Sequence, residues 1–286
     1  MQSISTDKKL SVAIQYALLT IGAVVFVFPL VWMLARSLMG LADLNSIPPK
    51  VFPSKAEFGN YVSIWSIRPL HLYIKNSAII EFFSVIGATV SATLCAYGFA
   101  RLRFPFRNAL FMAVLSTMML PTAVTMVPVY ILFSKIGWTN SFYPLTLPHF
   151  LGGGAFNIFL LRQFFYSIPK DFDEAARIDG ANTWSIFLKI AVPMCKPAIT
   201  VVAVWTFIGV WNDFMGPLIY LNDQAKFTLA LGLYGLSPGG IGVSNLMNTG
   251  QLMAVCSIAI LPVVVLFFLA QKRLISGISV TSGIKG

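Results

Sequence analysis

Two clusters of polar side chains in this 286-residue chain have types and spacing that could do chemistry. The first is acidic, runs from Asp171 to Glu174, and opens a polar segment between two strongly apolar runs. The second is the pair Asn212 and Asp213, which lies inside one such run. Carboxylates in a polar connection can bind a partner protein. An acid within a membrane span usually faces the bundle interior or a water-filled cavity, where it can hydrogen-bond a polar solute.

No arrangement of residues indicates catalysis. His71 and His149 are far apart in the sequence and form no base–nucleophile or metal-ligand constellation. The cysteines have neither metal-binding spacing nor an obvious disulfide partner. The chain contains no Walker A pattern, so any ATP must be bound by another chain. We therefore expect no enzymatic activity, no metal and no cofactor in this chain.

The composition indicates a membrane protein. Hydrophobic residues make up 57% of the chain and charged residues only 10%, whereas soluble domains carry about 25% charged residues. A spanning helix needs about 20 apolar residues. Six stretches meet that length, at residues 14–34, 76–100, 110–133, 143–165, 198–220 and 253–270. The fold class that we predict is an all-α polytopic membrane protein with six transmembrane helices.

The placement of the net charge of +10 predicts the orientation. The denser basic clusters precede the first span, follow the second, surround the polar segment and follow the last span. The positive-inside rule assigns these connections and both termini to the cytoplasm. Basic residues in the first outside loop dilute this bias, but long loops translocate largely regardless of charge. We divide the chain into residues 1–75, a transmembrane core at 76–272 that contains the polar segment 167–196, and a tail at 273–286.

Helix breakers and caps predict the finer structure. Residues 39–75 have the composition of an irregular outside loop with short helices, and Asn76–Ser77 are suited to cap the second span. Pro121 in the third span and Gly152–Gly154 in the fourth would free backbone polar groups at membrane depth. Such breaks can line a transport path, or glycines can allow close helix packing. Both interpretations stay open.

The polar segment has the local signals of two short helices joined by an elbow. Asp171 and Glu174 have the spacing of a capping box. Gly180 is suited to end this helix, and Asn182 or Thr183 can cap the next. A partner that moves the first helix would displace the fifth span through the second helix. The alternative is an ordinary amphipathic connection at the membrane interface.

The same segment resembles the E-A-A-x3-G-x9-I-x-L-P loop of permease subunits in ATP-binding-cassette (ABC) importers. The only departure is Val192, which stands where leucine is usual. The resemblance implies the type I ABC importer fold and an EAA coupling loop that docks on a separate ATPase, which binds ATP and Mg²⁺. It assigns this docking to Glu174, Ala175, Ala176, Asp179, Gly180, Ile190 and Pro193.

Shorter motifs along most of the chain are similar to the carbohydrate, maltose-type branch of these permeases, and within it to the smaller maltose-permease subunit. They include Arg103-Phe104-Pro105, Trp211-Asn212-Asp213 and the terminal Gly283-Ile284-Lys285-Gly286. The resemblance implies a second permease subunit as heterodimer partner, an ATPase dimer and an extracytoplasmic solute-binding protein. It also implies an ATPase contact for Ile284, Lys285 and Gly286, whereas a frayed chain end is the alternative.

Four residues are candidates for the solute path: Asn157, Trp205, Asn212 and Asp213. Sugar sites combine aromatic faces with amide and carboxylate hydrogen bonds, which these side chains could provide. Interhelical hydrogen bonding and interfacial anchoring are the alternatives. The resemblance also implies that the second permease holds most contacts with the solute.

The sequence therefore predicts a permease subunit in a bacterial inner membrane that forms half of an ATP-driven import path for a sugar or oligosaccharide. The same importer class acting on glycerol phosphate or another polar solute is the main alternative. An ion-coupled secondary transporter fits less well, because such proteins favour interior charge chains and repeated halves.

Overall fold

The computed structural model describes residues 6–236 and 247–282, and within these ranges the regular structure is helical. The chain divides into two compact units, which are described separately. Unit 1 comprises Met1–Leu70 and Leu233–Leu261, and unit 2 comprises His71–Gly232 and Pro262–Gly286. The predicted division at residues 75 and 272 stays a prediction.

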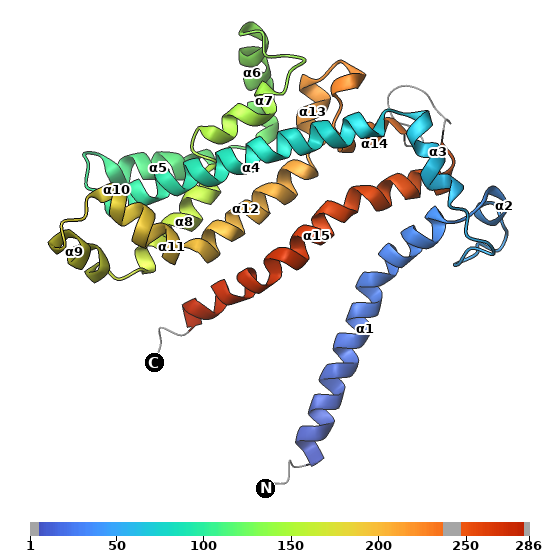
Figure 1. Cartoon of the computed structure of the whole chain (residues 1–286), viewed down its shortest axis with the longest axis horizontal. Helices are drawn as coiled ribbons and strands as arrows, with labels where there is room; N and C mark the ends of the chain where they lie inside the picture. Colours follow the sequence, from blue (N-terminus) through green and yellow to red (C-terminus); the bar gives the residue numbers. More distant parts are fainter. Residues whose placement is uncertain (1–5, 237–246, 283–286) are drawn as a thin grey trace. The chain divides into compact units, whose positions relative to one another are not determined.

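Figure 1 shows the order of the helices along the chain. The α-helices are α1 (Thr6–Ser37), α2 (Leu41–Leu44), α3 (Gly59–Ile67), α4 (Leu70–Arg101), α5 (Arg107–Thr117), α6 (Thr122–Lys135), α7 (Tyr143–Thr146), α8 (Ala155–Ser167), α9 (Asp171–Ile178), α10 (Thr183–Ile186), α11 (Val192–Met194), α12 (Lys196–Trp211), α13 (Met215–Tyr220), α14 (Leu229–Leu236) and α15 (Thr249–Ser282). Three shorter segments are η1 (Leu147–Phe150), η2 (Phe187–Ala191), which is π-helical, and η3 (Gln224–Lys226).

The described residues contain 4 helices long and apolar enough to cross a membrane, or up to 6 if each of two bent helix pairs is one span. The four are Ser11–Ser37, Leu70–Arg101, Tyr143–Ser167 and Thr249–Gln271. The bent pairs are Arg107–Thr117 with Thr122–Lys135 and Thr183–Met194 with Lys196–Trp211. The predicted six-span helical fold is confirmed when both pairs are counted as spans.

Two predicted spans are not continuous helices. The span predicted at 110–133 turns through 100° between α5 and α6, which confirms the break predicted at Pro121. Pro121 is extended (φ −60°, ψ 134°) and has no N–H to continue the helix. The span predicted at 198–220 ends as a helix at Trp211. There the Asp213 carboxylate accepts a bond from the Gly216 N–H (3.1 Å), so a local side-chain bond replaces the helical pattern.

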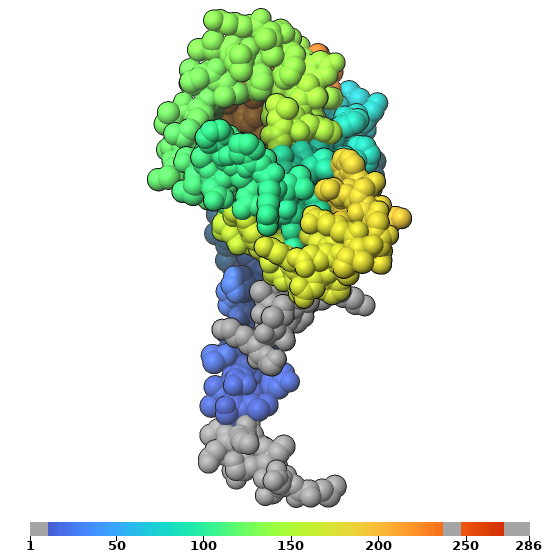
Figure 2. Space-filling model, turned by 90° about the vertical axis from the view of Figure 1, so that its left-hand side faces the viewer, coloured from blue at the N-terminus to red at the C-terminus, as the bar shows by residue number. Residues whose placement is uncertain are grey.

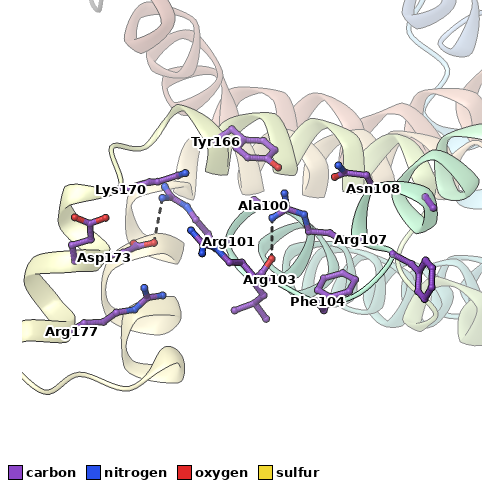
Figure 3. A pocket seen from close by; sticks show the side chains of 14 residues that line it. Ala100, Arg101, Arg103, Phe104, Arg107, Asn108, Tyr166, Lys170, Asp173 and Arg177 are labelled. Atoms are coloured by element: carbon purple, nitrogen blue, oxygen red, sulfur yellow. Dashed lines mark hydrogen bonds and ion pairs between the residues drawn. The ribbon is translucent and has the colours of Figure 1, made fainter.

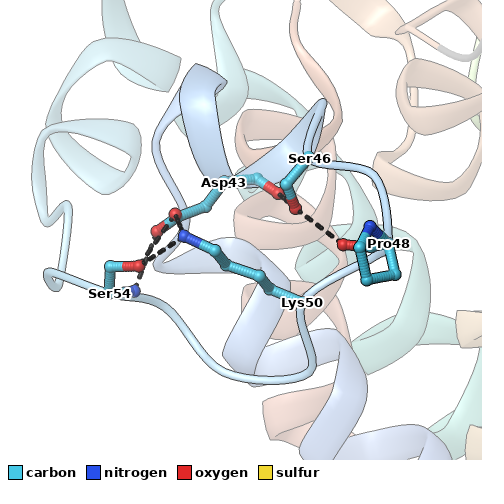
Figure 4. A network of polar contacts seen from close by, with 5 residues as sticks. All are labelled: Asp43, Ser46, Pro48, Lys50 and Ser54. Carbon is cyan, nitrogen blue, oxygen red and sulfur yellow. Dashed lines mark hydrogen bonds and ion pairs between the residues drawn. The ribbon is translucent and has the colours of Figure 1, made fainter.

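In unit 1, hydrogen bonds from polar side chains hold the segment after α1 in place. Asn60 is buried and donates to the carbonyl oxygens of Ser37 (2.9 Å) and Met39 (3.0 Å). Asp43 accepts bonds from the Lys50 ammonium (2.6 Å) and from the Ser54 backbone (2.8 Å) and hydroxyl (2.9 Å), as Figure 4 shows. The Lys50 bond, followed by those from Ser54, lowers the pKa of Asp43 to about 2. The predicted short helices in this loop are confirmed as α2 and α3.

The prediction that Asn76 and Ser77 begin the second span was wrong. α4 already begins at Leu70, so both residues lie inside the helix. Their side chains bind a later segment instead, since the Asn76 amide donates to the Ala225 carbonyl (2.8 Å) and the Ser77 hydroxyl accepts from the Leu229 N–H (2.8 Å). These bonds fasten α4 to the chain around η3 and α14.

Small residues let α4 approach its neighbours closely in unit 2. Ala88, Ala92, Ala96 and Ala100 recur every fourth residue and are each at most 4% exposed, as residues on one buried helix face must be. Gly153 (φ +67°) lies against the Ala88 backbone, where a Cβ would meet the carbonyl group. This contact favours the interpretation of Gly153 as a packing residue.

Candidate functional site

The polar segment folds into a short exposed helix, α9, as the sequence predicts, but its start differs. Lys170 is the N-cap residue, its side chain makes no capping bond, and Asp171 is the first helical residue. The backbone N–H groups of Asp173 and Glu174 bond to the Lys170 carbonyl oxygen (2.9 and 3.1 Å). The predicted capping box of Asp171 and Glu174 was therefore wrong. The acidic residues instead occupy the first turn, where the helix dipole favours them.

The end of α9 follows the prediction for Gly180. This glycine has φ +83°, a left-handed conformation that costs glycine little. Its N–H bonds to the Arg177 carbonyl (3.0 Å) and the Ala181 N–H bonds to the Ala176 carbonyl (2.9 Å), which is the Schellman pattern of a helix C-terminus. Asn182 then caps α10 by accepting a bond from the Ser185 N–H (2.8 Å). The predicted elbow of two helices at a glycine is confirmed.

A buried ion pair fastens α9 to the end of α4. The Arg101 guanidinium lies 3.3 Å from the Asp173 carboxylate, and both side chains are less than a tenth exposed. Arg101 also donates to the carbonyl oxygens of Phe165 (2.8 Å) and Ile168 (2.6 Å) at the end of α8. One side chain therefore joins α4, α8 and α9. The sequence gives no indication of this role of Arg101, because no local pattern relates residues so far apart.

Apart from the buried Asp173 and the partly buried Ala176, α9 is open to solvent. Glu174, next to the ion pair, and Ala175 are both exposed. Ile178 is 87% exposed and Trp184, on α10, is 61% exposed. Small and apolar residues beside carboxylates provide a surface that can fit a shallow groove in another protein.

The second half of the predicted loop connects this surface to α12. Phe187 in η2 is buried against Tyr97 of α4, with 4.9 Å between ring centroids. Ile190 is partly buried, whereas Pro193 in α11 is exposed. A turn of about 75° then leads into α12. Figure 2 shows that the segment from α9 to α11, in yellow and gold, lies on the surface of unit 2.

A groove of about 950 Å³ runs between the α4–α5 connection and α9 (Figure 3). Its walls carry five basic side chains and two carboxylates: Arg101, Arg103, Arg107, Lys170, Arg177, Asp173 and Glu174. The groove is therefore positively charged, although α9 itself begins with acids.

Within the described part of the chain, the four candidate solute residues lie in α8, in α12 and directly after α12. Asn157 is buried, donates to the Gly153 carbonyl (2.7 Å) and lies 3.4 Å from the Thr206 hydroxyl of α12. Trp205 is 63% exposed, and its ring packs on Phe156.

The other two candidates lie at the break between α12 and α13. Asn212 is exposed and donates to the Ile208 carbonyl (2.7 Å), and Asp213 bonds to Gly216. Their role in solute passage stays a prediction. The predicted contact residues Ile284, Lys285 and Gly286 lie outside the described residues.

The long apolar helices and the two bent helix pairs define a helical membrane protein. A chain of a bacterial ABC transporter involved in the import of the acidic polysaccharide alginate superposes with a TM-score of 0.82, with 95% of this chain and 99% of that chain covered. The two chains share 22% sequence identity, so this comparison shows the fold alone. The predicted type I ABC importer fold is confirmed.

Residues 88–280 match the profile of the binding-protein-dependent transport system inner membrane component family, and this chain belongs to that family. The diacetylchitobiose uptake system permease protein of Streptomyces coelicolor is 30% identical over 275 residues, or 96% of this chain and 89% of that protein. The sn-glycerol-3-phosphate transport system permease protein of Salmonella typhi is also 30% identical, over 92% of this chain and 94% of that protein. The chain is thus an inner-membrane permease subunit, as predicted.

Proposed function

We propose that this permease forms half of the membrane pathway of a sugar or oligosaccharide importer, together with a second permease subunit. A solute-binding protein delivers the sugar, and a separate ATPase dimer supplies the energy. ATP and Mg²⁺ bind to that ATPase, and this chain needs no cofactor of its own. Both termini are cytoplasmic, and Ile284, Lys285 and Gly286 contact the ATPase.

The observation that carries the proposal is the position of α9, which is open to solvent and ion-paired through Asp173. Glu174 and Ala175 face outward, where an ATPase can bind them. Asp173 faces Arg101 at the end of α4. A displacement of α9 by the ATPase is therefore passed to α4 through the ion pair and to α12 through the elbow. A bistable packed bundle can convert such a displacement into a change of pore access.

Alternation of access also needs a joint that can bend without unfolding. η2 is π-helical, and π-helical turns occur frequently at functional sites. The chain then bends by 75° between the helix that ends at Met194 and α12, which begins at Lys196. We assign the mechanical connection between α9 and the pathway to the residues from Ile190 to Cys195.

The coupling assignment is tested by reversing one exposed charge of α9. Glu174→Lys should abolish most ATP-driven uptake and release the ATPase during purification, while insertion into the membrane stays normal. Asp171→Lys is the matched control, because Asp171 is exposed on the same helix and is not part of the motif. Equal losses in both variants would refute docking through the motif and would indicate a general effect of charge.

The proposed substrate class is inferred from the solutes of similar permeases. Permeases for arabinooligosaccharides and galactooligosaccharides of Bacillus subtilis are each 31% identical to this chain. The match to glycerol-3-phosphate permeases keeps that solute as the second candidate. Purification from native membranes, with mass spectrometry of the attached proteins, should recover the second permease, the ATPase and the binding protein. Ligand binding by the recovered binding protein then decides between an oligosaccharide and glycerol phosphate.

A further inference from the structure

The groove between the α4–α5 connection and α9 contains more positive charge than its own carboxylates can neutralise. Five basic side chains and two carboxylates line it. One carboxylate, Asp173, is already paired with Arg101. Among the described residues, Arg103, Lys170 and Arg177 have no ion-pair partner. The remaining carboxylate, on Glu174, leaves a net excess of three positive charges in the groove.

A second observation concerns Arg101, whose side chain is only 4% exposed. Its two terminal nitrogens bind Asp173 and the carbonyls at the end of α8, but its Nε is buried and has no hydrogen-bond partner within the described chain. A buried donor without a partner is costly. Figure 3 shows Arg101 between Arg107 and the residues of α9, so its charge lies at the wall of the groove.

These features suit an oxygen-rich anion, because guanidinium groups donate in the fork geometry that a phosphate accepts. Arg107 contributes in the same way. It keeps one nitrogen on the Leu102 carbonyl (3.0 Å), and its other donors remain available. Asn108 and Tyr166 also line the groove, although the Tyr166 hydroxyl already donates to the Phe99 carbonyl (3.4 Å). The chemistry therefore points to a phosphate group.

The rim of the groove indicates the source of the phosphate. Phe106 is 81% exposed, and Leu102 and Phe104 are also exposed. α4 has 32 residues, or about 48 Å at about 1.5 Å per residue. The hydrocarbon core is about 30 Å thick, so Arg101 at the end of α4 can reach the headgroup layer. Apolar side chains at that depth can contact acyl chains while the basic residues hold the headgroup.

We propose that this groove binds the phosphate of an anionic phospholipid, which bridges the α4–α5 connection and α9. Basic pockets between membrane helices are suited to anionic headgroups. The bound lipid stabilises α9 in its observed place beside the end of α4. This inference does not rest on the coupling role of α9, because binding of the lipid is measured without transport.

The test compares phosphatidylglycerol and phosphatidylcholine on the transporter purified in mild detergent with its attached subunits. The protein is reconstituted into nanodiscs that contain either phosphatidylcholine alone or a mixture of both lipids. The lipid that stays with the protein after detergent washing is then quantified by mass spectrometry. The expected result is selective retention of phosphatidylglycerol by the unaltered protein.

The variant Arg103→Gln with Lys170→Gln removes two unpaired charges from the groove. Each basic residue near an anionic surface is worth about 1 kcal/mol, which is about fivefold in affinity. The double variant should therefore bind phosphatidylglycerol about 25-fold more weakly. The matched control, Lys55→Gln with Lys135→Gln, removes two exposed lysines that do not line the groove and should bind as the unaltered protein does.

Four results would overturn the proposal. The first is equal retention of the two lipids, and the second is equal weakening by the groove variant and the control. The third is competition by inorganic phosphate at the same concentration as phosphatidylglycerol, which would assign the site to free phosphate rather than lipid. The fourth is unchanged lipid binding with loss of an attached subunit in the groove variant, which would assign the groove to an acidic protein surface.

Discussion

Replacing Asp173 with asparagine should loosen α9 more than any other single change of charge in that helix. The variant keeps the size of the side chain but leaves the buried Arg101 without its counter-ion. Breaking a buried ion pair from one side costs about 3 to 5 kcal/mol. We expect the lower end, about 3 kcal/mol, because Arg101 keeps its bonds to the carbonyls of Phe165 and Ile168.

The assay is amide hydrogen exchange of the purified transporter, followed by mass spectrometry of peptides from α9. Local opening governs exchange in such a segment. A loss of about 3 kcal/mol corresponds to exchange about a hundredfold faster. Asp171→Asn is the matched control because Asp171 is exposed on the same helix. It loses only a favourable interaction with the helix dipole, worth about 0.3 to 1 kcal/mol and thus about fivefold at most.

A third variant, Arg101→Met, should give the fastest hydrogen exchange in α9. Arg101→Met removes the counter-ion of Asp173 and also the donors that satisfy two carbonyls at the end of α8, so its effect should exceed that of Asp173→Asn. Exchange in α9 should therefore increase from Asp171→Asn through Asp173→Asn to Arg101→Met. Equal exchange in the two aspartate variants would refute the conclusion that the ion pair holds α9 in place.

Three further predictions address other parts of the chain. Gly180→Ala should destabilise the end of α9 by about 1 to 2 kcal/mol through backbone strain alone, since a Cβ there meets no atom within 4 Å; hydrogen exchange of the elbow measures it. Gly153→Ala should reduce folded yield far more than Gly152→Ala, because both have positive φ but only a Cβ at position 153 would meet the Ala88 backbone. Asp43 has a folded pKa of about 2, below its ordinary 3.8, so its bonds stabilise the loop above about pH 4. That contribution to stability is lost as the pH falls toward 2. Limited proteolysis should then cleave the segment after α1 more rapidly, whereas cleavage at a rate independent of pH would contradict the prediction.

Much of the fold was predictable from the sequence, because a helix that crosses the hydrocarbon core of a membrane must be apolar and long enough to span it. The lengths of the apolar runs indicate how many segments can cross the core, and that prediction was confirmed. The break at Pro121 was predicted and is confirmed, whereas the end of the helix at Trp211 was not predicted. A hydropathy pattern measures length and polarity, and it carries no information on the angle at which two halves of a run meet.

Local chemistry at the coupling segment was also predictable in part. Gly180 and Asn182 act within a few residues of their partners, so their types and spacing were sufficient. The start of α9 was predicted one residue too late, because the capping box and the observed turn at Lys170 differ by only one position.

The sequence by itself determined that this chain is a helical membrane protein, which depends on its composition and on the lengths of its apolar runs. The resemblance of the segment from Glu174 to Gly180 to the EAA loop of importer permeases identified that segment as the element to examine. Only the tertiary structure decided that Arg101 binds Asp173 and that a basic groove lies beside α9. The cause is physical: these contacts join residues brought together when α4, α8 and α9 pack, and no periodicity along the chain encodes which distant side chains will meet.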